Sequence, residues 1–211
     1  MENSNQPLEE IKTIKRIMEQ SSRFLSLSGL SGISAGVVAI AGAVAARLII
    51  QGPVINAWGY SKTITESGDA RRILLLLLLN AAVVLVLALS SALFFSVRKA
   101  RRAGHKIWTP VSKRLLLNLA IPLLAGGLFI LLTLGQLPGS IIAAVTLIFY
   151  GLALVNAAKF TFGEIFWLGI FELLTGFLCL AIPGYAFIFW VFGFGILHIG
   201  YGLFMYLKYK G

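Results

Sequence analysis

Long apolar runs constrain this chain more than any other feature. Six of them follow one another between Leu27 and Leu207, separated by polar connections. Each is close to the roughly 20 residues that a helix needs to cross a hydrocarbon core about 30 Å thick. Hydrophobic residues make up 58% of the sequence and charged residues 12%, against about 25% charged in an ordinary soluble domain. The sequence therefore predicts an all-α membrane protein.

We expect six transmembrane helices in three hairpins, preceded by a short amphipathic cytoplasmic helix. The chain of 211 residues leaves no room for a second soluble domain. It divides into a cytoplasmic N-terminal segment (1–26), a six-helix transmembrane domain (27–207) and a cytoplasmic tail (208–211). The predicted spans are 27–50, 73–97, 115–137, 141–158, 162–182 and 186–207.

The most basic part of the chain connects the second and third spans. It carries seven Lys or Arg residues and no acidic residue, and we call these seven residues the basic patch: Arg98, Lys99, Arg101, Arg102, Lys106, Lys113 and Arg114. Short connections rich in Lys and Arg stay in the cytoplasm. With the spans oriented accordingly, fourteen of the 18 Lys and Arg residues fall inside and four outside. This bias predicts that both termini are cytoplasmic in an inner membrane.

The formal net charge of +10 would suggest a nucleic-acid partner in a soluble protein. Here much of the charge lies in the basic patch between two predicted spans, where it sets the orientation of the helices in the membrane. We therefore expect no nucleic-acid partner. A second interpretation stays open, in which the basic patch also holds anionic lipid headgroups or an acidic partner.

The N-terminal segment has an apolar stripe at helical spacing. Ile11, Ile14, Met18 and Leu25 are separated by three, four and seven residues, which is typical of an amphipathic helix. Such a helix can lie on the inner membrane surface. Alternatively, it is a docking helix for a cytoplasmic protein partner.

Small residues dominate the first span, where Gly32 and Gly36 lie four residues apart. Helices associate in membranes through close backbone approach, which small residues allow. We therefore expect this helix to be packed between others. The pattern fits a monomer or a dimer equally well, so the oligomeric state stays open.

The last two hairpins look like copies of one another. LLAGGLF (123–129) matches LLTGFLC (173–179), LPG (137–139) matches IPG (182–184), and YGL (150–152) matches YGL (201–203). The order agrees, which indicates a duplicated hairpin with a Pro-Gly outer turn. In these Gly-rich hairpins, residues 115–207 resemble the HdeD-like family of small bacterial inner-membrane proteins, which is associated with acid stress.

That resemblance implies a stress-related membrane protein and supplies no catalytic residues. The opening SRFLSLSGLSG (22–32) is also similar to an uncharacterised group of small bacterial membrane proteins. The basic patch and the amphipathic N-terminal helix are not part of either pattern.

Two ionisable residues fall near the middle of a span. Glu172 is about ten residues from the inner end of the fifth span, and His198 is about nine from the inner end of the sixth, so both lie roughly 14 Å deep. Gly169 and Gly176 flank Glu172, while Gly195 and Gly202 flank His198. We expect the two helices to approach along these glycine faces and to bring the carboxylate to the imidazole.

Two interpretations of this candidate intramembrane polar site stay open. In the structural one, the pair is a buried hydrogen bond with one shared proton that fixes the register of the last hairpin. In the functional one, Glu172 and His198 form a protonation site of a proton-coupled transporter or pH sensor, because imidazole titrates near neutral pH.

Further polar residues suggest a lesser hypothesis. Asn118 and Asn156 lie within one or two turns of the cytoplasmic helix ends. With Glu172 they could line a vestibule that opens to the cytoplasm, although a pore usually has more polar lining than this.

Enzyme motifs are lacking. The sequence contains no HExxH, no GxSxG and no glycine-rich phosphate loop. We expect no cofactor and no metal, since Cys179 is the single cysteine and the two histidines lie in different environments. The expected function is non-enzymatic, with a stress-related or regulatory role in the lipid bilayer. The alternative is a small proton-linked transporter or channel that uses Glu172 and His198.

Overall fold

A computed structural model of the protein describes residues 27–50, 70–104 and 106–209. Over these residues the chain is helical and contains no strand. Six helical stretches are long and apolar enough to cross a membrane: Gly29–Ile50, Arg71–Arg102, Pro110–Thr133, Gly139–Phe160, Glu164–Ala181 and Pro183–Lys208. The predicted all-α class is thereby confirmed, and so is the number of helices that are long and apolar enough to span a membrane. The predicted amphipathic N-terminal helix lies outside the described residues.

The first five spans are built on single long helices. These are α2 (Gly29–Ile50), α4 (Ala70–Arg102), α5 (Pro110–Thr133), α6 (Gly139–Ala157) and α7 (Glu164–Ala181). A 3-10 turn, η1 (Ala158–Phe160), follows α6. The sixth span is composite: a 3-10 turn η2 (Pro183–Tyr185), then α8 (Ala186–Trp190), a π-helical segment η3 (Val191–Leu197) and α9 (His198–Lys208).

The basic patch is mostly helical, which corrects the prediction of a long basic loop. The helix α4 runs five residues past the predicted end of the second span and includes Arg98, Lys99, Arg101 and Arg102. Lys and Arg are good helix formers, so the end of the apolar run did not mark the end of the helix. Of the seven residues, only Lys106 lies in the connection between α4 and α5.

The start of α5 is fixed by local chemistry. The Thr109 hydroxyl accepts a hydrogen bond from the Ser112 backbone N–H at 3.1 Å, and the Ser112 hydroxyl accepts one from the Thr109 N–H at 2.8 Å. This capping box satisfies two N–H groups that the helix cannot. Pro110 at the first helical position has no N–H to satisfy.

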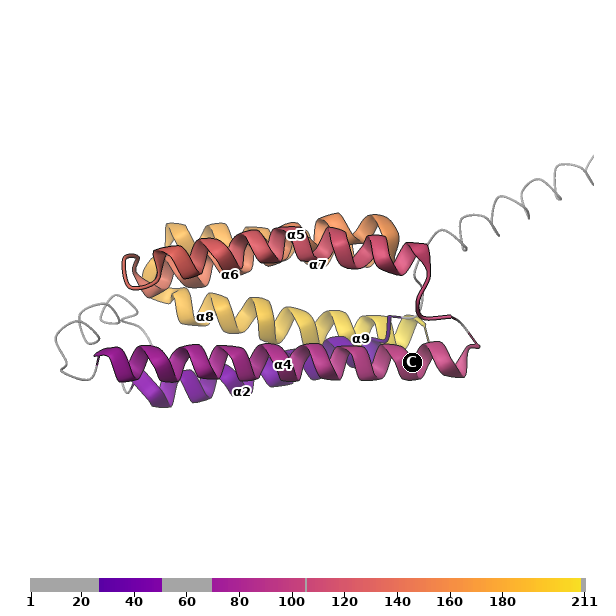
Figure 1. The fold of residues 1–211 in the computed structure, drawn as a ribbon, viewed down its shortest axis with the longest axis horizontal. Coiled ribbons are helices and arrows are strands. Elements are labelled where there is room, and N and C mark those ends of the chain that lie inside the picture. The colour runs from indigo at the N-terminus through magenta and orange to yellow at the C-terminus, as the bar shows by residue number, and fades with distance from the viewer. Residues whose placement is uncertain (1–26, 51–69, 105, 210–211) are drawn as a thin grey trace, which may run out of the picture.

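The helices form two groups with the sixth span between them (Figure 1). The α2 and α4 pair lies on one side, and α5, α6 and α7 lie on the other. The last span contacts α2 through η3 and α9, and contacts α6 and α7 through α8 and η3. The most extensive contact in the bundle is between α6 and α7. The sixth span is therefore central.

Glycines pack the helices closely, but with partners other than those expected. Gly195 and Gly202 face α2, where a Cβ on Gly202 would lie 2.5 Å from the Ile33 nitrogen. Gly169 and Gly176 face α6, with Gly169 against Gly151. The prediction that the glycine faces of the last two spans meet each other was therefore wrong. Helical spacing shows which residues share a face, but it does not show which helix covers that face.

Candidate functional site

The structure brings Glu172 and His198 together at the middle of the bundle. Glu172 lies on α7, and His198 is the first residue of α9. Nδ1 of His198 is 3.3 Å from Oε1 of Glu172. Glu172 is 0% exposed and His198 is 5% exposed. The sequence predicted this contact correctly, because Glu172 and His198 lie at similar depths in their spans. The glycine faces that were expected to bring them together pack against other helices.

A third polar group, the Tyr150 phenol on α6, completes the site. Its Oη lies 2.7 Å from Nε2 of His198, so both ring nitrogens of the histidine face polar atoms. We call Glu172, His198 and Tyr150 the buried triad. Sequence reasoning missed Tyr150, because one tyrosine in an apolar helix is usually a packing residue. The repeated YGL motif was the available signal, since it placed a hydroxyl at equivalent positions of two spans.

The π-helical segment shapes one wall of the site. Gly193 lies in η3, and its carbonyl oxygen is 3.1 Å from Nδ1 of His198. A Cβ at this position would lie 2.7 Å from Oε2 of Glu172, so only glycine lets the segment approach the carboxylate. Single turns of π-helix inside longer helices often occur at functional sites.

The surroundings of the carboxylate are apolar. Neither oxygen of Glu172 has a hydrogen-bond partner of good geometry among the described residues, and the contact with His198 is an ion-pair distance. The Phe194 ring packs 5.1 Å from the Tyr150 ring and 6.1 Å from the His198 ring, measured between centroids. A net charge is costly in such a place. One proton shared between Glu172 and His198 leaves the pair without net charge.

The hypothetical vestibule of Asn118, Asn156 and Glu172 does not fit this geometry. Glu172 has no exposed surface, so it does not line a water-filled entrance. The Asn118 amide donates to the Arg114 carbonyl one turn earlier in its own helix, at 2.9 Å. Asn156 is half-buried near the end of α6.

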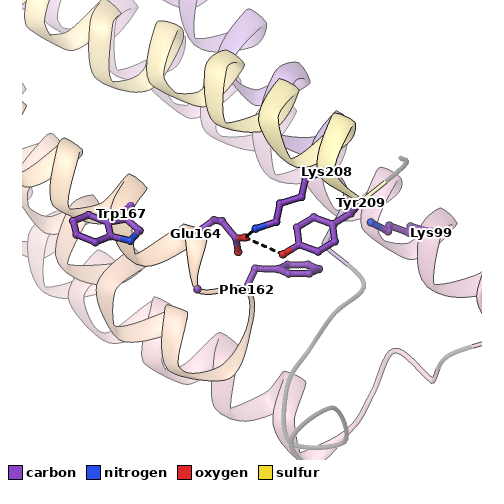
Figure 2. A pocket seen from close by; sticks show the side chains of 7 residues that line it. Lys99, Phe162, Glu164, Trp167, Lys208 and Tyr209 are labelled. Atoms are coloured by element: carbon purple, nitrogen blue, oxygen red, sulfur yellow. Dashed lines mark hydrogen bonds and ion pairs between the residues drawn. The ribbon is translucent and has the colours of Figure 1, made fainter. Parts of the chain in front are cut away.

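A second polar cluster lies at the end of the bundle that carries the basic patch, which we call the basic end. Glu164, at the start of α7, accepts hydrogen bonds at Oε1 from Lys208 at 2.5 Å and from the Tyr209 phenol at 2.8 Å. Figure 2 shows both side chains directed at this carboxylate. Partial desolvation, and next the hydrogen bond to Glu164, raise the pKa of Tyr209. The phenol is therefore a neutral donor at pH 7.

These groups surround a pocket of about 790 Å³. Its lining residues are Lys99, Phe162, Gly163, Glu164, Trp167, Lys208 and Tyr209. Among the basic patch, Lys99 alone turns inward, and its Nζ donates to the Leu27 carbonyl at 3.3 Å. The other six side chains are exposed. The sequence did not predict this pocket, because its residues come from three segments far apart in the chain.

Over the described part of the chain, no three His, Cys, Asp or Glu side chains are grouped closely enough to hold a metal ion. Comparisons with protein-family models, with curated proteins and with solved structures found no match to the chain. The length and composition of the six helices are those of an integral membrane protein.

Proposed function

We propose that this is a non-enzymatic integral membrane protein whose last span responds to pH through proton exchange at the buried triad. The observation that carries this proposal is Glu172, a fully buried carboxylate whose charge partner is a histidine. Imidazole is the side chain that titrates in the physiological range. Ionisable residues within membrane spans are rare and commonly functional.

A purely structural role accounts less well for the arrangement. A buried pair that only fixes helix register is most stable when every polar atom is hydrogen-bonded. Here neither carboxylate oxygen has such a bond to any of the described residues. A stress-related role, which the resemblance of residues 115–207 to the HdeD-like family would imply, agrees with a pH response.

Trp190 provides a test close to the site. Its ring lies 4.9 Å from that of Phe194, which packs on Tyr150 and His198. In a protein whose other tryptophans are changed to Phe, the fluorescence of Trp190 should vary with pH. The same titration in a Glu172→Gln variant should be flat or clearly displaced. The same pH dependence of Trp190 fluorescence in both proteins would contradict the proposal.

Proton-linked transport is the second candidate, and the closed environment of Glu172 favours it. A carboxylate shielded from both bundle ends, beside a glycine-containing π-helical segment, resembles an occluded state of a carrier. Proton flux into liposomes under an imposed pH gradient tests this directly. Flux that Glu172→Gln abolishes, with the fold intact, would make the protein a transporter. No flux in either protein would leave pH-dependent regulation as the function.

We also propose that the chain lies in a bacterial inner membrane as three hairpins, with both termini and the basic end in the cytoplasm. The bias of Lys and Arg supports this orientation. Cysteine labelling tests it in a Cys179→Ser background, because Cys179 is the single cysteine. Lys106 and Gln136 are exposed near opposite ends of α5. Cysteine at Lys106 should react only from the cytoplasm and cysteine at Gln136 only from outside.

The proposed partners follow from this orientation. The N-terminal segment would lie on the inner membrane surface as an amphipathic helix or dock a cytoplasmic protein. The six exposed side chains of the basic patch would attract anionic lipid headgroups.

A further inference from the structure

The pocket at the basic end combines aromatic rings with charged groups. Phe162, Trp167 and Tyr209 supply the rings, and Lys99, Glu164 and Lys208 supply the charges (Figure 2). This composition differs from the rest of the described surface of the spans, which is dominated by exposed Leu, Val and Phe side chains. A mixed polar and aromatic lining is typical of sites that bind an amphipathic ligand.

The charges in the pocket do not balance. Glu164 is already neutralised by Lys208, with a hydrogen bond from Tyr209 in addition. The Lys99 ammonium has no carboxylate partner among the described residues, and lies 6.0 Å from the centroid of the Phe162 ring. It has three donors, and one of them is used by the Leu27 carbonyl. Counting the described residues alone, the pocket therefore carries one net positive charge, and the Lys99 ammonium has donors that none of them uses.

The position of the pocket indicates the source of its ligand. It lies where α7 begins and α9 ends, and in a bundle that crosses a bilayer such helix ends would lie near the lipid headgroups. Trp167 is 61% exposed, and tryptophan and tyrosine favour the headgroup layer. Arg98, Arg101 and Arg102 are exposed on the last turns of α4, the helix that carries Lys99. Cations in this position attract anionic lipids.

We propose that this pocket binds the headgroup of one anionic phospholipid, with a phosphate oxygen accepting a hydrogen bond from Lys99. The acyl chains leave past Trp167 into the bilayer. Gly163 keeps one wall open, because a Cβ there would meet no atom within 4 Å. This site is independent of the buried triad, and it gives the general attraction of the basic patch for anionic lipid one defined position.

Lipid titration of the purified full-length protein in detergent, followed by native mass spectrometry, tests this proposal. Dioleoyl phosphatidylglycerol should bind saturably with one tight site. Dioleoyl phosphatidylcholine, which has the same chains and no net charge, should bind more weakly. Glycerol 3-phosphate in place of the lipid distinguishes the two sources of phosphate. If it occupied the site as tightly as the lipid, the ligand would be a soluble phosphate and the proposal would be wrong.

Three variants locate the site. Lys99→Met keeps the length of the side chain and removes its charge, so phosphatidylglycerol should bind about tenfold more weakly. Gly163→Leu fills the pocket without changing any charge, and should also displace the lipid. Lys113→Met is the matched control, because Lys113 is an exposed member of the basic patch that does not line the pocket. Equal lipid affinity in all three variants would overturn the proposed pocket and leave only diffuse attraction.

Discussion

Nδ1 of His198 and Oε1 of Glu172 lie 3.3 Å apart in the middle of the helix bundle, with both side chains buried. The two residues come from different helices, and a third helix contributes Tyr150 to the other side of the imidazole. Removing one charge from such a pair would leave the other uncompensated in apolar surroundings. This relationship leads to separate expectations for each member of the buried triad.

Glu172→Gln and Glu164→Gln are the same substitution eight residues apart on one helix. Loss of the shared proton at high pH would leave a net negative charge on the wild-type pair, so its melting temperature should fall as the pH rises. Glu172→Gln cannot acquire that charge, and its melting temperature should fall less. Glu164→Gln removes a partly exposed ion pair and should cost less than about 1 kcal/mol.

The fall in melting temperature with rising pH should persist in Glu164→Gln. This variant is therefore the control for all other groups that titrate. Circular dichroism in detergent at each pH gives the three melting curves. Parallel curves for wild type and Glu172→Gln would contradict a shared proton.

Tyr150 and Tyr201 occupy matching YGL motifs but have different partners. The Tyr150 phenol bonds to His198, whereas the Tyr201 hydroxyl is buried without a hydrogen-bond partner among the described residues. Tyr150→Phe should therefore lower the free energy of unfolding by about 1 kcal/mol. Tyr201→Phe should be neutral or stabilising, because it removes a buried hydroxyl that gains nothing. Denaturant unfolding in mixed micelles measures both, and the reverse order would show that the hydroxyl of Tyr201 is the better satisfied.

Gly193 and Gly200 lie in the sixth span, seven residues apart. A methyl group at Gly193 would overlap Leu147 and approach Oε2 of Glu172 to 2.7 Å. Gly193→Ala should therefore destabilise the protein by about 1–3 kcal/mol through overpacking. A methyl group at Gly200 meets no atom within 4 Å, so Gly200→Ala should be stabilising by up to about 1 kcal/mol. Thermal unfolding of the two variants tests the packing; equal melting temperatures would show that η3 moves aside at little cost.

The positions of the six helices could be predicted from the sequence, but which helices pack against one another could not. Apolar runs located all six helices, because hydrocarbon thickness sets their length. Helix ends were less accurate where Lys and Arg extend a helix beyond the apolar core, as in α4. The packing partners of Gly176 and Gly202 could not be read from spacing, since the central position of the sixth span depends on contacts between helices distant in the sequence.

The candidate site was predicted in part for the same reason. Ionisable residues inside an apolar run are easy to recognise in the sequence. Glu172 and His198 were predicted to be in contact because they lie at similar depths in their spans. Tyr150 carries no charge, and the carbonyl of Gly193 is a backbone group, so neither stands out in an apolar run. The pocket at the basic end depends on Glu164 meeting Lys208 across 44 residues, which no local pattern reports.

The most direct test of proton exchange at the buried triad is the nitrogen NMR spectrum of ¹⁵N-histidine-labelled protein as a function of pH. The chain contains two histidines, His105 and His198, so a His105→Gln variant leaves the His198 ring as the one labelled signal. We predict that its two nitrogen resonances move with pH, and that Glu172→Gln changes this pH dependence. Resonances that stay fixed from acid to alkaline pH, in a folded protein, would contradict proton exchange and leave the pair a structural contact.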